Sequence, residues 1–167
     1  EALRNREGVE RISVAGSLRR RGETSKDIDI VVATDAPAPI MDAFTTAPNV
    51  EAVTGHGETK SSVRLKSGMA ADLRCVSAKE FPFALLYFTG SKAHNVALRG
   101  RAQKRGFTLN EYALEKTDGS GKRLPCADEA AIYKALGLEY IEPELREDLG
   151  EIEAAEAGTL PTLIEES

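Results

Sequence analysis

Within the first eighty residues, short segments in which apolar and polar side chains alternate with a period of two are typical of half-buried β-strands. Glycine-bearing turns separate most of the alternating segments. One helix is expected among them, because an acidic residue and prolines precede a run that fits a helix from near Pro39 to before Pro48. The strands are predicted at residues 9–16, 27–34, 50–57, 61–68 and 69–77.

From Lys79 onward the apolar positions follow a helical period. Residues 106–125 are predicted to form a small hairpin that turns at 118–121, and Ser91 is placed to cap a helix. The fold class is therefore α+β, with a mixed sheet of about five strands and one flanking helix, followed by a small domain of helices and a hairpin. The helices of this second part are predicted at residues 79–88, 91–106 and 127–137.

Length and composition fit one hydrophobic core or two small ones. The chain has 167 residues, of which 41% are hydrophobic and 29% are charged. No run of residues approaches a membrane span and no secretory signal is evident, so a cytoplasmic protein with no membrane partner is expected. The two cysteines and two histidines are too few and too scattered for a disulfide framework, a zinc cage or a histidine-based triad. Any metal ion is expected to be a hard cation held by oxygen.

Charge is unevenly distributed along the chain. Residues 1–126 carry 20 Lys and Arg against 15 Asp and Glu, whereas residues 127–167 carry 2 against 12. The two parts therefore have net charges of +5 and −10. A basic surface favours a polyanionic partner, so the partner is expected on the first three quarters of the chain.

Two aspartates, Asp27 and Asp29, flank a single isoleucine at the start of the second predicted strand. Alternate side chains of a strand share a face, so both carboxylates point one way while Ile28 and Ile30 point into the core. Asp72, on the last predicted strand, supplies a third carboxylate if that strand lies beside the second. Carboxylates are costly to bring together without a cation, and oxygen-only ligation selects Mg²⁺ or Mn²⁺.

Three carboxylates around two hard cations are what nucleotidyl transfer requires, because one metal activates the attacking oxygen and the other neutralises the triphosphate. Gly16 lets the backbone approach a phosphate, and Ser17 offers a hydroxyl and an N–H. Arg20 and its neighbours have the forked donors that clamp phosphates. Taken singly, these features are also typical of a turn, a solvated strand face and surface charge; their order along the chain favours a nucleotide site.

Two stretches of the sequence resemble family X DNA polymerases, the group that includes DNA polymerase beta. They read GSLRRRGETSKDIDIVV and ALLYFTGSKAHNVALRGRAQKRGFTLNEYAL. The second stretch is the more specific, because nucleotidyltransferases in general share the Gly-Ser and Asp-x-Asp pattern. The resemblance runs from about Val9 to Gly150. Lys92, at a position where the vertebrate polymerase has an acidic residue, is similar to the bacterial branch of the family.

The resemblance implies a role for each matching residue in a polymerase site. Asp27, Asp29 and Asp72 would bind two catalytic Mg²⁺ or Mn²⁺ ions, and Asp72 would accept the proton of the primer 3′-hydroxyl. Asn95 would meet the minor-groove edge of the incoming base. The other residues implied in binding the deoxynucleotide are Gly16, Ser17, Arg20, Ser25, Tyr87, Phe88, Thr89, Gly90 and Lys92.

The resemblance also implies a DNA-binding surface. Lys92, Asn95 and Arg99 fall at i, i+3 and i+7 of one predicted helix and so share a face, from which Arg99 would contact the template strand. Arg74 resembles a switch residue beside Asp72 that changes partners when the site closes. The basic residues expected to contact DNA are Arg74, Arg99, Arg101, Lys104 and Arg105.

The resemblance further implies an organisation in parts. Residues 1–78 would form a nucleotidyltransferase-type palm, and residues 79–150 a small α/β thumb that binds nucleotide and DNA. Residues 151–167 would be an acidic linker toward a missing C-terminal phosphoesterase domain, so the chain is expected to be a palm and thumb fragment. A monomer is expected, acting in a bacterial cytoplasm on gapped or primer-template DNA with dNTPs as substrates.

The sequence leaves three functions open. The first is a DNA-directed DNA polymerase core that fills short gaps during repair. The second is a template-independent nucleotidyltransferase acting on RNA ends or small acceptors, which a test of template dependence would distinguish. The third is a module that binds gapped DNA or nucleotide without chemistry, which a comparison of turnover with binding would identify.

Overall fold

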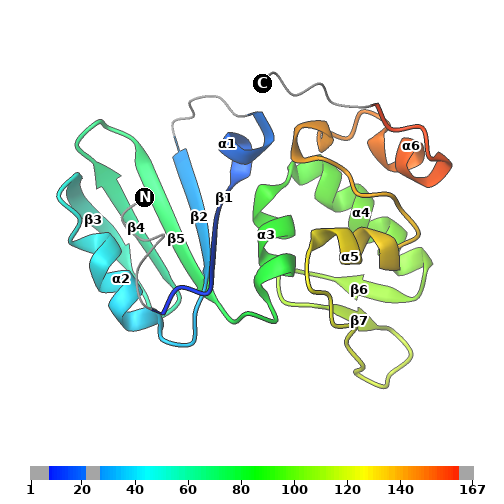
Figure 1. The fold of residues 1–167 in the computed structure, drawn as a ribbon, viewed down its shortest axis with the longest axis horizontal. Coiled ribbons are helices and arrows are strands. Elements are labelled where there is room, and N and C mark those ends of the chain that lie inside the picture. The colour runs from blue at the N-terminus through cyan, green and yellow to red at the C-terminus, as the bar shows by residue number, and fades with distance from the viewer. Residues whose placement is uncertain (1–7, 22–26, 162–167) are drawn as a thin grey trace.

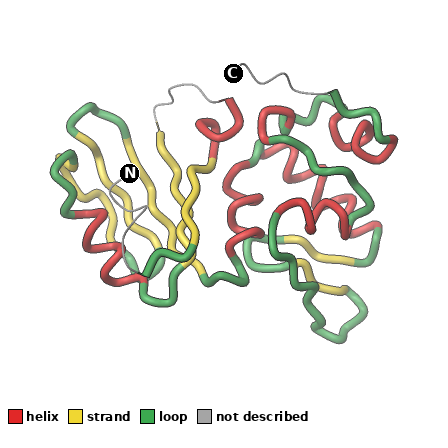
Figure 2. The backbone as a smooth tube through the Cα atoms, in the orientation of Figure 1, coloured by secondary structure: helices red, strands yellow, loops and turns green. Residues whose placement is uncertain are grey.

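A computed structural model gives the fold of residues 8–21 and 27–161. Figure 1 shows a β-sheet lying beside a mostly helical part of the chain. We call residues 8–76 the sheet region and residues 77–161 the helical region. Figure 2 shows the same division, with long strands on one side and most of the helices on the other.

The alternating pattern of the sheet region corresponds to five strands: β1 (Arg11–Ala15), β2 (Asp27–Ala33), β3 (Val50–His56), β4 (Lys60–Leu65) and β5 (Ala70–Val76). They form one mixed sheet in the order β1-β2-β5-β4-β3. β2 and β5 are parallel, whereas the other neighbouring strands are antiparallel. The prediction of a mixed sheet of about five strands is confirmed. Because β2 and β5 are adjacent, residues 43 positions apart in sequence, such as Asp29 and Asp72, become neighbours.

One face of the sheet is covered by α2 (Pro37–Thr45). Ile40 and Phe44 of this helix pack with Val32 and Leu73 of the two central strands. These strand residues belong to the alternate set that also includes the isoleucines beside the aspartates. The period of two therefore sends the apolar set toward α2 and the aspartates toward the opposite face.

The other face of the sheet meets α3 (Phe81–Thr89), the helix of the helical region that lies beside the sheet in Figure 1. Phe81 and Leu85 belong to a cluster with residues of β1 and β2. Phe83 and Leu86 belong instead to the core of the helical region. A helix that is apolar all round must be covered on both sides, so α3 is shared by the two regions.

The helical region has its own core around Leu98, Tyr133 and Ile141. Ser91 caps its longest helix as predicted, since the Ser91 Oγ accepts a hydrogen bond from the His94 N–H at 3.2 Å. The helices and strands here are α4 (Lys92–Lys104), β6 (Phe107–Leu109), β7 (Leu114–Lys116), α5 (Glu129–Ala135) and α6 (Glu151–Ala157). A short 3-10 helix, η1 (Pro143–Leu145), and α1 (Gly16–Arg21) of the sheet region complete the secondary structure of the described residues.

The segment predicted as one hairpin contains two turns, and the first of them lies earlier than predicted. β6 and β7 pair across residues 110–113, where the Asn110 side chain accepts hydrogen bonds from the N–H groups of Tyr112 and Ala113. Asparagine stabilises turns in this way. The predicted turn at 118–121 also joins paired segments: Glu115 and Arg123 form a β-bridge, and the N–H groups of Lys116 and Leu124 donate to the carbonyls of Lys122 and Leu114, both at 2.8 Å.

Part of the stretch expected to be an acidic linker is a packed helix. α6 buries Ile152 and Ala155 in the core of the helical region. Its remaining residues are mostly glutamate and alanine, which are strong helix formers. Among the helices of residues 8–21 and 27–161, none is long and apolar enough to cross a membrane.

Candidate active site

The three aspartates lie on one face of the adjacent parallel strands β2 and β5. Asp29 is in register with Asp72, and Asp27 is in register with Ala70. Ile28 packs with the cluster beneath α2, on the opposite face. The strand adjacency that the third carboxylate required is therefore present.

The carboxylates are not gathered into a closed cage. Among residues 8–21 and 27–161, no three carboxylate, histidine or cysteine side chains are close enough to hold a metal ion. The Nη1 of Arg74 lies 3.4 Å from the Oδ1 of Asp29, and its guanidinium lies 3.9 Å from the centre of the Phe88 ring. The positive charge of Arg74 therefore favours the ionised form of Asp29.

Asp29 is incompletely compensated by this arginine. Burial is the main cause that raises the pKa of its carboxyl above the ordinary value; the charge of Arg74 opposes this, and the neighbouring carboxylates Asp72 and Asp27 raise the pKa further. Three carboxylates on this face meet one arginine, so formal negative charge exceeds positive charge here, and burial adds to the cost of ionising Asp29. An oxygen-only donor set with excess negative charge fits a hard divalent cation.

Gly16 brings the start of α1 into contact with the aspartates. Its φ is +66°, and a Cβ atom at this position would lie 2.6 Å from the Oδ2 of Asp29. Only glycine adopts this conformation easily and leaves room for the carboxylate. Ser17 follows in the same short helix and is half-buried. The Gly-Ser pair therefore lies directly beside the carboxylates, as its position ahead of Asp27 suggested.

Arg20 lies across the junction between α1 and the end of α3. Its Nη1 donates to the Thr89 carbonyl at 2.6 Å and its Nε donates to Glu147 at 2.8 Å. A Cβ on Gly90 would lie 3.2 Å from the Arg20 Nη1, so this glycine leaves room for the guanidinium. Ser25 lies outside the described residues.

A buried ion network joins the same α1 to the helical region. Arg19 donates to both Glu129 oxygens, at 2.5 and 2.9 Å, and to the Thr89 hydroxyl at 2.8 Å. Arg146, with no exposed surface, donates to Glu129 at 2.9 Å. Burial would raise the pKa of Glu129, but hydrogen bonds and charge from the two arginines outweigh it and lower this pKa. Sequence reasoning missed this network because Arg19 and Glu129 are 110 positions apart.

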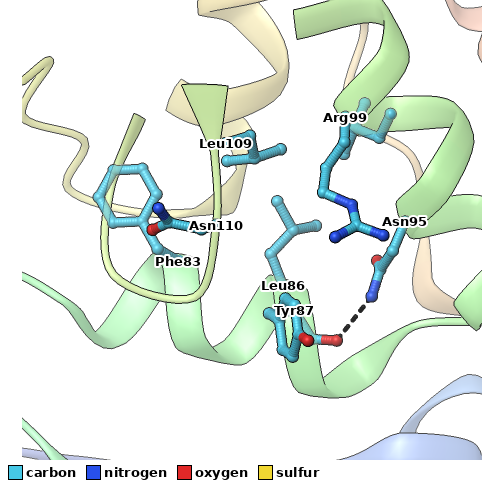
Figure 3. Close-up of a pocket in the computed structure, with 8 residues that line it drawn as sticks. Phe83, Leu86, Tyr87, Asn95, Arg99, Leu109 and Asn110 are labelled. Carbon is cyan, nitrogen blue, oxygen red and sulfur yellow. Dashed lines mark hydrogen bonds between the residues drawn. The ribbon is translucent and has the colours of Figure 1, made fainter. Parts of the chain in front are cut away.

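A small pocket opens between α3, α4 and β6 (Figure 3). Asn95 points toward Tyr87 in this view, and its Nδ2 donates to the Tyr87 carbonyl at 2.7 Å. Arg99 lies one turn further along α4 on the same side. The lining residues are Phe83, Leu86, Tyr87, Asn95, Leu98, Arg99, Leu109 and Asn110. The pocket therefore combines an apolar floor with the polar groups of α4.

The remaining predicted residues divide into two groups. Lys92, Arg99, Lys104 and Arg105 are exposed. Arg101, expected to contact DNA, is instead tied within the protein: its Nε donates to the Leu136 carbonyl and its Nη1 to Glu156, both at 2.7 Å. These partners lie at the end of α5 and on α6, so the guanidinium of Arg101 is committed to holding the helical region together.

Comparison with known proteins places these features in a family. The DNA polymerase beta thumb model matches residues 84–147. The DNA polymerase/3′-5′ exonuclease PolX of Bacillus subtilis (strain 168) is 41% identical over 146 residues, which are 86% of this chain and 25% of that protein. DNA polymerase lambda of Rattus norvegicus is 39% identical over 85 residues, which are 46% of this chain and 15% of that protein.

The chain matches most of the length of a viral relative. The repair DNA polymerase X of African swine fever virus is 28% identical over 144 residues, 81% of this chain and 80% of the viral protein. By contrast, the chain spans only a small part of the Bacillus and rat proteins, 25% and 15% of their lengths. The thumb match and these relatives agree with the motifs on β2, α3 and α4, and the chain belongs to the family X DNA polymerases.

Proposed function

We propose that the chain is the catalytic core of a DNA-directed DNA polymerase that adds deoxynucleotides to a primer 3′ end in short gaps during repair. The sheet region would be its nucleotidyltransferase palm and the helical region its thumb. One observation carries the proposal: Asp29 and Asp72 are in register on adjacent strands, with Gly16 pressed against Asp29. The relatives named as repair polymerases support the same process.

Two divalent cations, Mg²⁺ or Mn²⁺, are proposed to be held by Asp27, Asp29 and Asp72. The donor set fits, because it is all oxygen and because burial and neighbouring carboxylates raise the pKa of Asp29. When bound, such ions favour ionisation of the attacking hydroxyl and neutralise charge on the phosphates. Arg74 adds a positive charge 3.4 Å from the Oδ1 of Asp29.

The protein residues around this site are proposed to position the reactants for in-line attack on the α-phosphate. Asp72 would accept the proton of the primer 3′-hydroxyl. Ser17, Arg20 and the backbone of Gly16 would hold the triphosphate, with Ser25 supporting the loop. Arg20 already binds a carboxylate of Glu147, which shows that its guanidinium can reach an anion at this junction.

The sugar and base of the nucleotide are proposed to lie along the end of α3 and the start of α4. The segment Tyr87–Gly90 would line the sugar, and Asn95 would contact the minor-groove edge of the base beside the pocket of Figure 3. Lys92 is exposed nearby and would attract the phosphates. Arg74, Arg99, Lys104 and Arg105 would contact DNA, with Arg101 left out because its Nε and Nη1 already donate to Leu136 and Glu156. We propose a monomer in a bacterial cytoplasm.

The test is templated primer extension on a duplex with a one-nucleotide gap, at low salt to favour phosphate contacts. Asp72→Asn is expected to lower the extension rate by on the order of 10³-fold, because it removes a charge that the chemistry needs. Asp42→Asn, an exposed carboxylate on α2, is the matched control and should extend normally.

Other outcomes would redirect the assignment. Near-normal extension by Asp72→Asn would remove the carboxylate site from the mechanism. Insertion without regard to the template base would identify a template-independent transferase. Metal-dependent nucleotide binding without any insertion would identify a binding module.

A further inference from the structure

A chain of buried polar groups connects α6 with the first turn of α4. His94 has no exposed surface. Its Nδ1 lies 2.5 Å from the Oε2 of Glu151, and its Nε2 lies 2.9 Å from the hydroxyl of Tyr133. Three helices, α4, α5 and α6, each contribute one member of this chain.

Each hydrogen bond among these three side chains has a defined donor: Tyr133 donates to His94, and His94 donates to Glu151. Burial would raise the pKa of Glu151, but the hydrogen bond from His94 and the backbone N–H groups of Asp148 and Leu149 lower it, so the side chain is ionised. A carboxylate only accepts hydrogen bonds, hence the His94 proton is on Nδ1. Burial lowers the pKa of His94, which keeps the ring neutral and makes Nε2 an acceptor for the Tyr133 hydroxyl.

The hydrogen-bonded groups include the residue next to Asn95, whose side-chain amide is proposed to contact the nucleotide. His94 directly precedes Asn95, whose side chain binds the Tyr87 carbonyl at the rim of the pocket. The same turn is held at a second point, because the Ser91 N–H donates to the Arg146 carbonyl at 2.9 Å. Residues 146–151 therefore hold the first turn of α4 from two sides.

α6 is itself firmly placed, as a positioning role requires. Ile152 and Ala155 are buried in the core of the helical region. The Glu156 carboxylate pairs with Arg101 at 2.7 Å, and the Glu139 N–H donates to the Ala155 carbonyl at 3.3 Å. The helix can therefore transmit its position to His94 through Glu151.

We propose that Glu151 is a positioning residue for nucleotide binding: acting through His94, it fixes the first turn of α4 and the orientation of Asn95. The inference rests on the proposed function, in which Asn95 contacts the incoming nucleotide. It assigns a role to a helix that lies in the stretch expected to be a linker.

The test compares Glu151→Ala, His94→Ala and the double variant in templated gap filling. Each single variant is expected to raise the KM for the nucleotide about tenfold and to change kcat by less than about twofold, because binding rather than chemistry is affected. The KM of the double variant should equal that of the more impaired single variant, since both changes break the same hydrogen bond between Glu151 and His94. Glu153→Ala, which removes an exposed carboxylate of the same helix, is the control and should not change KM.

Amide hydrogen exchange of residues 91–99 provides a readout that needs no catalysis. Exchange is expected to be faster than in Glu153→Ala for both single variants. If the wild type fails to extend primers, the proposed function fails, and exchange alone then decides whether Glu151 fixes the turn. Glu151→Gln, which keeps a hydrogen bond but loses its charge, should give a smaller rise in KM and replaces Glu151→Ala if that variant does not fold.

Two results would overturn the proposal. One is additive effects of the two single variants on KM, which would mean that Glu151 does not act through His94. The other is a lower melting temperature with KM and exchange in α4 equal to those of the control, which would mean that the pair only stabilises the fold.

Discussion

The two regions of the molecule differ in how they compensate the charge of their carboxylates: half-buried Asp29 in the sheet region, and buried Glu129 and Glu151 in the helical region. In the sheet region the pKa of Asp29 is raised, whereas in the helical region the pKa values of Glu129 and Glu151 are lowered. The difference lies in their partners. Asp29 has one arginine contact at 3.4 Å and carboxylate neighbours, while Glu129 binds two arginines and Glu151 binds His94 and two backbone N–H groups.

This contrast separates binding from folding. A carboxylate whose charge is fully compensated holds elements together, and it has little left to offer a ligand. A carboxylate whose charge is only partly compensated costs stability and is typical of a functional site. The same argument can be tested by removing one charge from each region.

The largest expected effect is on stability, from one chemical change made in both regions. Glu129→Gln should lower the free energy of unfolding by about 3–5 kcal/mol, because it leaves buried Arg146 without a counter-charge. Asp29→Asn should leave stability unchanged or increase it, because it relieves repulsion with Asp72. Urea denaturation of the two variants measures both. Similar losses of stability would show that the contrast in compensation does not exist.

A smaller effect is expected in the pH dependence of stability. The folded-state pKa of His94 lies below its ordinary 6.5. The contribution of the neutral His94 ring to the free energy of unfolding is therefore complete above about pH 6.5, and it is lost as pH falls through the folded-state pKa. Glu151, also lowered, acts in the same direction at lower pH. The groups facing His94 are Glu151, Tyr133, Arg146 and Asp148.

The measurement is the melting temperature between about pH 7 and pH 5, the range in which an unfolded histidine takes up its proton. The wild type should lose melting temperature as pH falls, and His94→Gln should lose less. For Asp29 the change of stability with pH has the opposite sign: its pKa is raised, so protonation as pH falls removes an unfavourable charge from the folded protein. A steeper loss in His94→Gln than in the wild type would contradict the assignment of a neutral buried ring.

The smallest expected effect concerns DNA binding by the exposed and the engaged arginine and lysine side chains of α4. Lys104→Gln should lower the slope of log affinity against log salt by about 1, as expected for loss of one phosphate contact. Arg101→Gln should leave the slope unchanged, because its guanidinium binds Leu136 and Glu156. Fluorescence titrations of gapped DNA at several salt concentrations measure the slope for each variant. A reduced slope for Arg101→Gln would show that this arginine also contacts DNA.

The sequence predicted the sheet well because strand alternation is a local property. Each strand buries one face, so the position of Asp27, Asp29 and Asp72 on a common face follows from the period of two and from the pairing of β2 with β5. The capping role of Ser91 is local in the same sense. What the alternation could not supply is the position of Arg74 on Asp29, which depends on the balance of charge across two strands.

The missed features all depend on contacts between distant residues. Glu129 looks like an ordinary acidic residue in the first turn of a helix, and its partner Arg19 like one of a run of surface arginines. His94 and Glu151 are 57 positions apart. The acidic composition of residues 151–157 favours a linker, although Ile152 and Ala155, which α6 buries, are spaced i, i+3 as on a helix face.

The double burial of α3 has a consequence for anyone who would exchange thumbs between polymerases of this family. Phe81 and Leu85 are fitted to one partner and Phe83 and Leu86 to another, within a single helix. A chimera joined just before Phe81 would carry a foreign surface against the host sheet, and one joined just after Thr89 would carry a foreign surface against the donated thumb. The boundary between the exchangeable units is a plane through α3 rather than a position in the sequence, so a working graft has to redesign one face of this helix.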